Sequence, residues 1–234
     1  MSDKTEGTFA PEQEGGRGIE VLNLPEVRVS SALFARIRDS QGRYALLVNK
    51  NRAKKGDILL TPIGGAIEAT EEGLQSLQQL LEIEKIAFEK GNDLRFRMPG
   101  KKANEFRAWF LQRQQRETNP IREVVEELVD EAELLKKEDL GELQCDLVGF
   151  DTELEETTRI GQEGQMTLRL LEIFEAGLKA EILTKLEELS NQPNAVIYFA
   201  TAEEIQAGQT NDGIKISKSS NSLLNPKETI EPFI

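Results

Sequence analysis

The amino-acid sequence predicts an α+β fold in which helices pack around a mixed β-sheet. Segments of alternating apolar residues, typical of strands, occur along the chain together with segments whose apolar residues recur at helical spacing. The two kinds of segment do not follow one another in a regular strand–helix–strand alternation, which argues against a purely parallel sheet. Hydrophobic residues make up 38% of the 234 residues, which is enough to build a core.

Apolar periodicity and turn residues place the individual elements. The first two predicted strands are joined by a short turn at residues 40–43, so we expect them to form a hairpin. Asn119 and Pro120 predict the start of a helix, since a capping side chain is followed there by proline at the first helical position. Strands are expected over residues 27–37, 44–48, 58–60, 94–98, 145–150, 166–174 and 195–199, and helices over 73–90, 103–115, 120–137, 178–189 and 202–206.

The two ends of the chain are predicted to lie outside the folded domain. Residues 1–25 are polar and rich in glycine, without the apolar stretch of a signal peptide, and we expect a flexible N-terminal tail. Residues 218–234 are predicted to form a C-terminal tail. One domain should therefore occupy residues 26–217.

Composition excludes several kinds of chemistry. The chain has no histidine and a single cysteine, Cys145. Catalytic triads, imidazole ligands, an internal disulfide and a cysteine zinc cluster are therefore excluded. The remaining candidates are carboxylates, hydroxyls, Lys, Arg and a metal held by oxygen ligands. The lone cysteine fits a reducing cytoplasm, where we expect the protein. No apolar run approaches the ~18 residues of a membrane span, so we expect no membrane partner.

Charge is distributed unevenly along the chain. The net charge of −13 argues against nucleic acid as a bulk partner. Residues 122–156 carry a net charge of −11, whereas residues 93–116 carry +5. An acidic block beside a basic block suits a polyanion held by a cation. The alternative is two separate solvated surfaces, the more common origin of charge runs.

The acidic block contains one segment with a specific pattern, Arg122-Glu123-Val124-Val125-Glu126-Glu127. On a helix its three glutamates stand at i, i+3 and i+4 and share one face. Like charges at this spacing repel by roughly 0.2–0.5 kcal/mol per pair. A hard divalent cation such as Mg²⁺ or Mn²⁺ would offset the repulsion, because it prefers oxygen ligands. The alternative is an acidic surface neutralised by nearby Lys and Arg.

This segment and the Gly64-Gly65 loop together resemble the Nudix hydrolase family. The family's box reads G-x5-E-x7-R-E-U-x-E-E-x-G-U, where U is a bulky aliphatic residue. Gly65 to Glu71 resembles its first part, and Arg122 to Glu127 its second. Fifty residues (72–121) separate the two parts, against seven in the family, and Val129 stands at the position of the family's glycine. The resemblance implies a Nudix-like α/β/α sandwich around a mixed sheet, with a mostly helical inserted subdomain over residues 72–119.

The resemblance also implies roles for individual residues. The metal, Mg²⁺ or Mn²⁺, would be held by Glu123, Glu126 and Glu127 and by the backbone carbonyl of Gly64. Arg122 would hold the loop through an ion pair with Glu71 or Glu123. The implied activity is hydrolysis of a nucleoside diphosphate linked to another moiety, by attack of water on phosphorus. The candidate catalytic residues are thus Glu71, Arg122, Glu123, Glu126 and Glu127.

Basic side chains near the loop are candidates for substrate phosphates, since Arg and Lys neutralise phosphate. Trp109 and Phe110 are expected in the core rather than stacked on a base, because they share helical spacing with Phe106. Many Nudix proteins dimerise, so the resemblance also admits a homodimer. The candidate substrate-binding residues are Arg36, Lys50, Arg52, Gly64 and Gly65, and the expected partner is a small nucleotide.

Two other functions compete with the hydrolase. A Nudix-fold module could bind a nucleotide without turning it over, and the long insertion and the change at Val129 point that way. An acidic interaction protein without a small-molecule site is the third hypothesis. Retention of all three glutamates favours the hydrolase. A split box of this kind also resembles Nudix domains found beside bacterial cyclic-nucleotide signalling enzymes.

Overall fold

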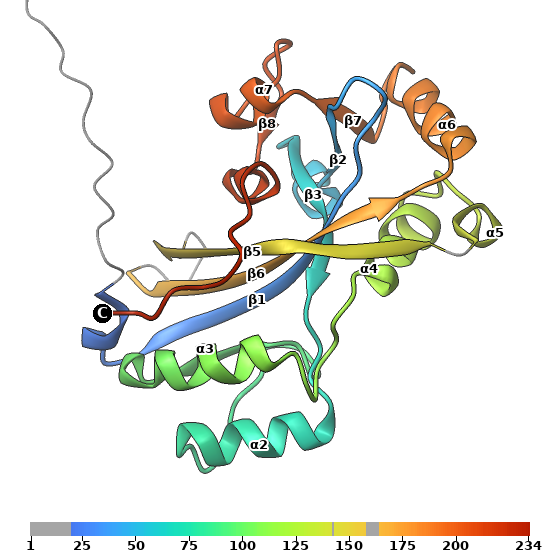
Figure 1. The fold of residues 1–234 in the computed structure, drawn as a ribbon. Coiled ribbons are helices and arrows are strands. Elements are labelled where there is room, and N and C mark those ends of the chain that lie inside the picture. The colour runs from blue at the N-terminus through green and yellow to red at the C-terminus, as the bar shows by residue number, and fades with distance from the viewer. Residues whose placement is uncertain (1–19, 142, 158–163) are drawn as a thin grey trace, which may run out of the picture.

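The computed structural model describes residues 20–141, 143–157 and 164–234, which are arranged around one mixed sheet (Figure 1). The strand order is β5-β6-β1-β3-β2-β7, with β4 paired to β1 and β8 paired to β3. The predicted α+β fold is confirmed. The strands are β1 Val27–Arg36, β2 Tyr44–Val48, β3 Leu59–Ala66, β4 Arg95–Met98, β5 Gln144–Glu156, β6 Met166–Gly177, β7 Ile197–Ala200 and β8 Lys215–Ile216.

Helices cover both faces of the sheet. Each of the longer helices has an amphipathic sequence, and α2 also has an N-cap, where the Thr70 side chain accepts a hydrogen bond from the Gly73 N–H. No helix among the residues described is long and apolar enough to cross a membrane. The helices are α1 Lys50–Ala53, α2 Glu71–Leu81, α3 Ala103–Gln112, α4 Ile121–Val125, α5 Lys137–Leu140, α6 Ala180–Ser190 and α7 Ala202–Ala207, the π-helix is η3 Glu126–Glu131, and the 3₁₀ helices are η1 Glu20–Asn23, η2 Gly100–Lys102 and η4 Lys218–Leu223.

The expected hairpin of the first two strands is wrong. β3 lies between β1 and β2 and pairs antiparallel with both of them. In the described part of the chain, the two strands meet directly only beside the turn, at the bridge between Arg38 and Tyr44 with its backbone hydrogen bonds from Ala45 to Ile37 and from Asp39 to Arg43. β3 carries buried side chains for both faces of the sheet, Leu60 on one and Ile63 on the other, so it gains most from a central position.

The core is divided by the sheet. On one face, the aromatic residues of the insertion pack against β1 and β6, and Val124 and Leu128 pack further along the same face against Ile63. On the other face, the sheet is covered by η4 and α7. Trp109 and Phe110 lie in the first of these clusters, with 6.0 Å between the ring centroids of Phe106 and Trp109. Their predicted place in the core is confirmed.

The insertion is a helical layer beside the sheet. In Figure 1, α3 lies next to β1 and α2 lies on the far side of α3. Its two ends meet in an isolated bridge between Ala69 and Arg116, and the Glu117 N–H donates to the Glu68 carbonyl at 2.8 Å. The insertion is therefore closed over residues 70–115 rather than 72–119. Loop closure of this kind costs little additional entropy as a loop lengthens.

The C-terminal segment is not a loose tail, contrary to expectation. Lys227 and Phe150 exchange backbone hydrogen bonds of 2.7 Å, which place the segment along β5. Ile230 and Phe233 are buried in the core, and Asn104 of α3 hydrogen-bonds the Phe233 backbone. The two apolar anchors stand among polar residues without strand or helix periodicity, so their burial depends on the tertiary structure.

The beginning of the described chain is also packed. Val21 of η1 is fully buried, and the Gly100 N–H donates to the Leu24 carbonyl at 3.1 Å. The tail predicted over residues 1–25 is therefore wrong for residues 20–25, and its first 19 residues lie outside the described residues.

Candidate functional site

The acidic helix lies with its carboxylates against the end of β3. The helix begins at Ile121, one residue later than predicted, with Pro120 at the N-cap position, and the Asn119 side chain accepts a hydrogen bond from the Ile121 N–H at 3.2 Å. α4 continues into the π-helix η3, in which the Ala132 N–H reaches the Glu127 carbonyl at 2.9 Å. The predicted helix to residue 137 is too long, because regular structure ends at Glu131. Burial of Val124 and Leu128 turns the acidic face toward Gly64 and Gly65.

Gly64 and Gly65, expected in a loop after a strand over residues 58–60, lie within β3 and pair with Phe34 and Leu33 of β1. Two glutamates are seated directly on this glycine pair. The Gly64 N–H donates to Glu127 Oε2 at 2.7 Å. The Glu123 carboxylate lies so close to Gly65 that an added Cβ atom would be 2.1 Å from Oε2. Gly64 has φ +141°, and a Cβ there would meet the Leu33 carbonyl oxygen at 2.1 Å. Both glycines are thus required by close approach, one of them to a side chain of the acidic helix.

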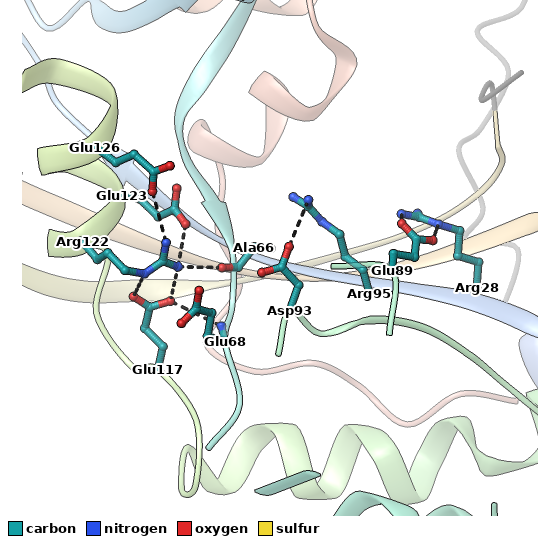
Figure 2. A network of polar contacts seen from close by, with 10 residues as sticks. All are labelled: Arg28, Ala66, Glu68, Glu89, Asp93, Arg95, Glu117, Arg122, Glu123 and Glu126. Carbon is teal, nitrogen blue, oxygen red and sulfur yellow. Dashed lines mark hydrogen bonds and ion pairs between the residues drawn. The ribbon is translucent and has the colours of Figure 1, made fainter. Parts of the chain in front are cut away.

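Arg122 holds this helix against the end of β3 (Figure 2). Its guanidinium donates to the Glu117 carboxylate at 2.9 and 3.0 Å and to the Ala66 carbonyl at 3.1 Å. It also forms ion pairs with Glu123 at 2.7 Å and with Glu126 at 3.4 Å. These partners, above all Glu117, which accepts two hydrogen bonds from the guanidinium, raise the pKa of Arg122 above its ordinary value. Arg122 therefore holds the helix, the end of β3 and the preceding segment together.

The role expected of Glu71 belongs to Glu117. Glu71 is the exposed first residue of α2, and among the described residues no hydrogen bond or ion pair joins it to Arg122. With residues 70–115 set aside, five residues (66–69 and 116) separate Gly65 from Glu117. That is the spacing of the first half of the box. The predicted pair of Arg122 with Glu123 is present, whereas the alternative pair with Glu71 is not. Glu71 is excluded because the insertion begins before it, as the backbone contacts that join residues 68–70 to residues 115–117 show.

Burial governs the electrostatics of the seated glutamates. It raises the pKa of Glu127 to about 8; the Gly64 N–H opposes the shift, and Glu123, Glu131 and Glu126 add to it. Burial also raises the pKa of Glu123, although Arg122 partly offsets the effect. Glu127 has no cationic partner among the residues described. Positive charge brought to this carboxylate would therefore be strongly favoured.

The donor set has the chemistry of a hard-cation site. Carboxylate and backbone carbonyl oxygens are the ligands that Mg²⁺ prefers, and the half-buried Glu127 carboxylate, which has no cationic partner among the described residues, lies at the centre of the group. As the side chains stand, Glu123 and Glu126 both pair with Arg122. Within residues 20–141, 143–157 and 164–234, no three His, Cys, Asp or Glu side chains are close enough together to hold a metal ion. The residue types fit the metal, whereas a closed ligand cage is absent from this arrangement.

A cavity of about 470 Å³ opens beside Glu127. Lys50 and Lys54 of the α1 region line it, and the Lys50 ammonium donates to the Glu131 carbonyl at the end of the acidic helix. The cavity therefore joins basic side chains to the seated carboxylate. Its lining residues are Leu47, Val48, Asn49, Lys50, Asn51, Lys54, Thr61, Glu127, Asp130, Glu131, Ala132 and Val196.

Two of the predicted phosphate contacts lie elsewhere. Arg36 pairs with Glu175 at 2.6 Å and donates to the Leu223 carbonyl. Its strand neighbours Ala35 and Ile37 face the acidic helix, so alternation directs Arg36 to the opposite face of the sheet. Arg52 pairs with Asp57 at 2.6 Å on the surface and does not line the cavity. Lys50, the third of these predicted contacts, lines the cavity, and so does Lys54 of the same basic segment.

The fold and this site define the class of protein. A mixed sheet carries a pair of glycines at the end of β3, and an arginine-anchored acidic helix places two carboxylates against them, which is the arrangement of a NUDIX domain. Residues 26–224 match the family of SMODS-associated NUDIX domains, and the chain belongs to that family. No curated protein and no solved structure matches the chain.

Proposed function

We propose that this domain is a metal-dependent hydrolase that cleaves a phosphoanhydride bond in a nucleoside diphosphate linked to another moiety. One observation carries the proposal. The half-buried Glu127 carboxylate is fixed by the Gly64 N–H, has no cationic partner among the described residues and borders a cavity lined by two lysines. A site with this charge distribution would be completed by a cation and a phosphate group together.

Each residue of the site has a distinct role in the proposed reaction. Glu126 and Glu127, with Glu123 and the Gly64 carbonyl, would hold Mg²⁺ or Mn²⁺. When bound, such an ion neutralises phosphate charge and supplies an activated water. Arg122 keeps the helix against Ala66, so the carboxylates stay in place beside the glycine pair. The Lys50 and Lys54 side chains would bind phosphate oxygens on the cavity side.

A second candidate is a nucleotide-binding module without turnover. It is favoured by the pairing of Glu123 and Glu126 with Arg122, which leaves no ready three-carboxylate cage among the residues described. Under this reading the cavity binds a nucleotide and the carboxylates serve the structure. The two candidates differ in whether turnover depends on metal and on Glu127.

The decisive experiment is turnover of a nucleotide panel by the purified protein with Mg²⁺ or Mn²⁺. The panel covers nucleoside triphosphates, nucleotide sugars, dinucleoside polyphosphates and dinucleotide cofactors. Metal-dependent cleavage that Glu127→Gln abolishes would support the hydrolase. The matched control is Glu138→Gln, because Glu138 is an exposed glutamate outside the site. Thermal stabilisation by a nucleotide without cleavage would favour the second candidate. The absence of both cleavage and stabilisation would refute both candidates.

A further inference from the structure

A buried carboxylate lies on β6, outside the acidic helix. Glu172 is fully buried, and its Oε1 accepts hydrogen bonds from Arg116 at 2.6 Å and from Arg113 at 3.1 Å. Its Oε2 has no hydrogen-bond partner among the described residues. Glutamate is almost never fully buried unless it is paired, and burying an ion pair has a substantial desolvation cost. The cluster therefore needs an explanation beyond filling space.

The remaining donors of the two arginines point at the segment that leads into the acidic helix. Arg116 donates to the Glu117 carbonyl at 2.8 Å, and Arg113 donates to the Thr118 carbonyl at 2.6 Å. Arg116 is also fixed by the Phe110 carbonyl at 2.6 Å and by the Phe110 ring, 4.2 Å below its guanidinium. Through these contacts Glu172 fixes the backbone of two successive residues.

The side chain of the first of these residues is the main partner of Arg122. Glu117 accepts two hydrogen bonds from Arg122, which in turn contacts Glu123 and the Ala66 carbonyl. An unbroken series of contacts thus runs from Glu172 through Arg116 and Glu117 to Arg122. It starts on β6 and ends at the carboxylates of the acidic helix.

We propose that Glu172 is a positioning residue of the site, which acts through Arg113 and Arg116 to hold Glu117 against Arg122. Docking of the insertion does not require this cluster, because Phe96, Phe106 and Phe110 already pack its elements into the core and backbone pairing closes its ends. What the cluster adds is a fixed place for the segment before the helix. The link to metal binding and turnover rests on the proposed function, whereas the order of this segment does not.

The test compares Glu172→Gln with a matched control, Glu175→Gln. Glu175 lies on the same strand and also forms ion pairs with two arginines, Arg36 and Arg38, but these arginines lie at the end of β1 and outside the site. Backbone hydrogen exchange is measured over residues 116–127 and over the rest of the chain. Glu172→Gln should speed exchange in this segment by about tenfold or more relative to the remaining core, and Glu175→Gln should not.

Metal dependence provides the second readout. Loss of a residue that orients metal ligands typically weakens metal affinity by about 10–100-fold, so Glu172→Gln should raise the half-saturating Mn²⁺ concentration by that factor. Both residues act through one series of contacts. Glu117→Gln should therefore change the half-saturating Mn²⁺ concentration much less when Glu172→Gln is already present than it does alone. Glu117→Gln and Glu175→Gln should instead combine additively.

Unchanged exchange over residues 116–127, or the same general acceleration in both variants, would overturn the inference. Additive effects of Glu117→Gln and Glu172→Gln on Mn²⁺ half-saturation would also overturn it. If Glu172→Gln does not fold, Arg113→Lys replaces it, since Arg113 is partly exposed and a lysine lacks the fixed fork by which Nε contacts Glu172 and Nη2 contacts Thr118. A wild-type protein without Mn²⁺ binding or turnover would refute the proposed function, and the exchange comparison would still decide the role of Glu172.

Discussion

Replacing Gly65 by alanine would place a Cβ atom in the space of the Glu123 carboxylate. The added atom would lie 2.1 Å from Oε2 and 2.3 Å from Cδ, whereas ordinary contacts begin at 3.4 Å. The carboxylate must therefore move by about 1 Å or more, away from Arg122 or from its place beside the glycine pair. A displacement of about 1 Å at a positioned group can lower turnover by about 100-fold. The crowded atoms are the far end of a flexible side chain that can rotate away, so we expect little loss of stability from the crowding itself.

The assay combines Mn²⁺-dependent turnover, Mn²⁺ binding by calorimetry and thermal unfolding. Gly177→Ala is the control, because an added Cβ there would meet only the Gln144 carbonyl, at 3.7 Å. We expect Gly65→Ala to lose about 100-fold in turnover and to bind Mn²⁺ more weakly, while Gly177→Ala matches the wild type. Turnover and metal affinity within about threefold of wild type in Gly65→Ala would refute the reasoning that Glu123 is seated against this glycine.

Three further predictions concern Glu127, the C-terminal segment and Arg36. The pKa of about 8 that burial gives Glu127 means that the folded protein retains a proton that the unfolded chain loses near 4.5, so stability should fall as the pH rises from about 5 to 8. After allowance for partial exposure, the free energy of unfolding should fall by roughly 2 kcal/mol over this range. Glu127→Gln should abolish this pH dependence, and the same pH dependence in wild type and variant would contradict the raised pKa of Glu127. Phe233→Ala should destabilise the fold by about 3–5 kcal/mol in denaturant titrations, because Phe233 is buried in the core; a loss below about 1 kcal/mol would show that the C-terminal segment contributes little. Arg36→Lys should leave Mn²⁺ binding and turnover unchanged while lowering the melting temperature, and a changed nucleotide KM would restore Arg36 as a substrate contact.

The parts of the site that follow from local pattern were predictable from the sequence. Helical spacing of Glu123, Glu126 and Glu127 determines that they share a face, and the adjacent apolar stripe determines which face is buried. The Gly64-Gly65 pair, in contrast, was expected in a loop, and its place inside β3 depends on pairing with β1. The strand over residues 44–48 was predicted with the bounds of β2 because its apolar run and flanking turn are both local signals.

The parts that depend on tertiary contacts were not predictable. Glu117 replaces Glu71 because the insertion closes at Ala69 and Arg116, and a single sequence does not show where an insertion closes. The face on which Arg36 lies depends on which neighbours of β1 enter the core near the acidic helix. The insertion of β3 between β1 and β2 and the burial of Phe233 likewise depend on pairing between distant segments.

We propose above all that the carboxylates beside Gly64 and Gly65 hold a divalent cation. Anomalous diffraction at the manganese edge, from crystals grown with Mn²⁺, tests this claim most directly. We predict an anomalous peak in contact with the carboxylates of Glu126 and Glu127. A well-ordered site without such a peak, or a peak found only elsewhere on the molecule, would contradict the account.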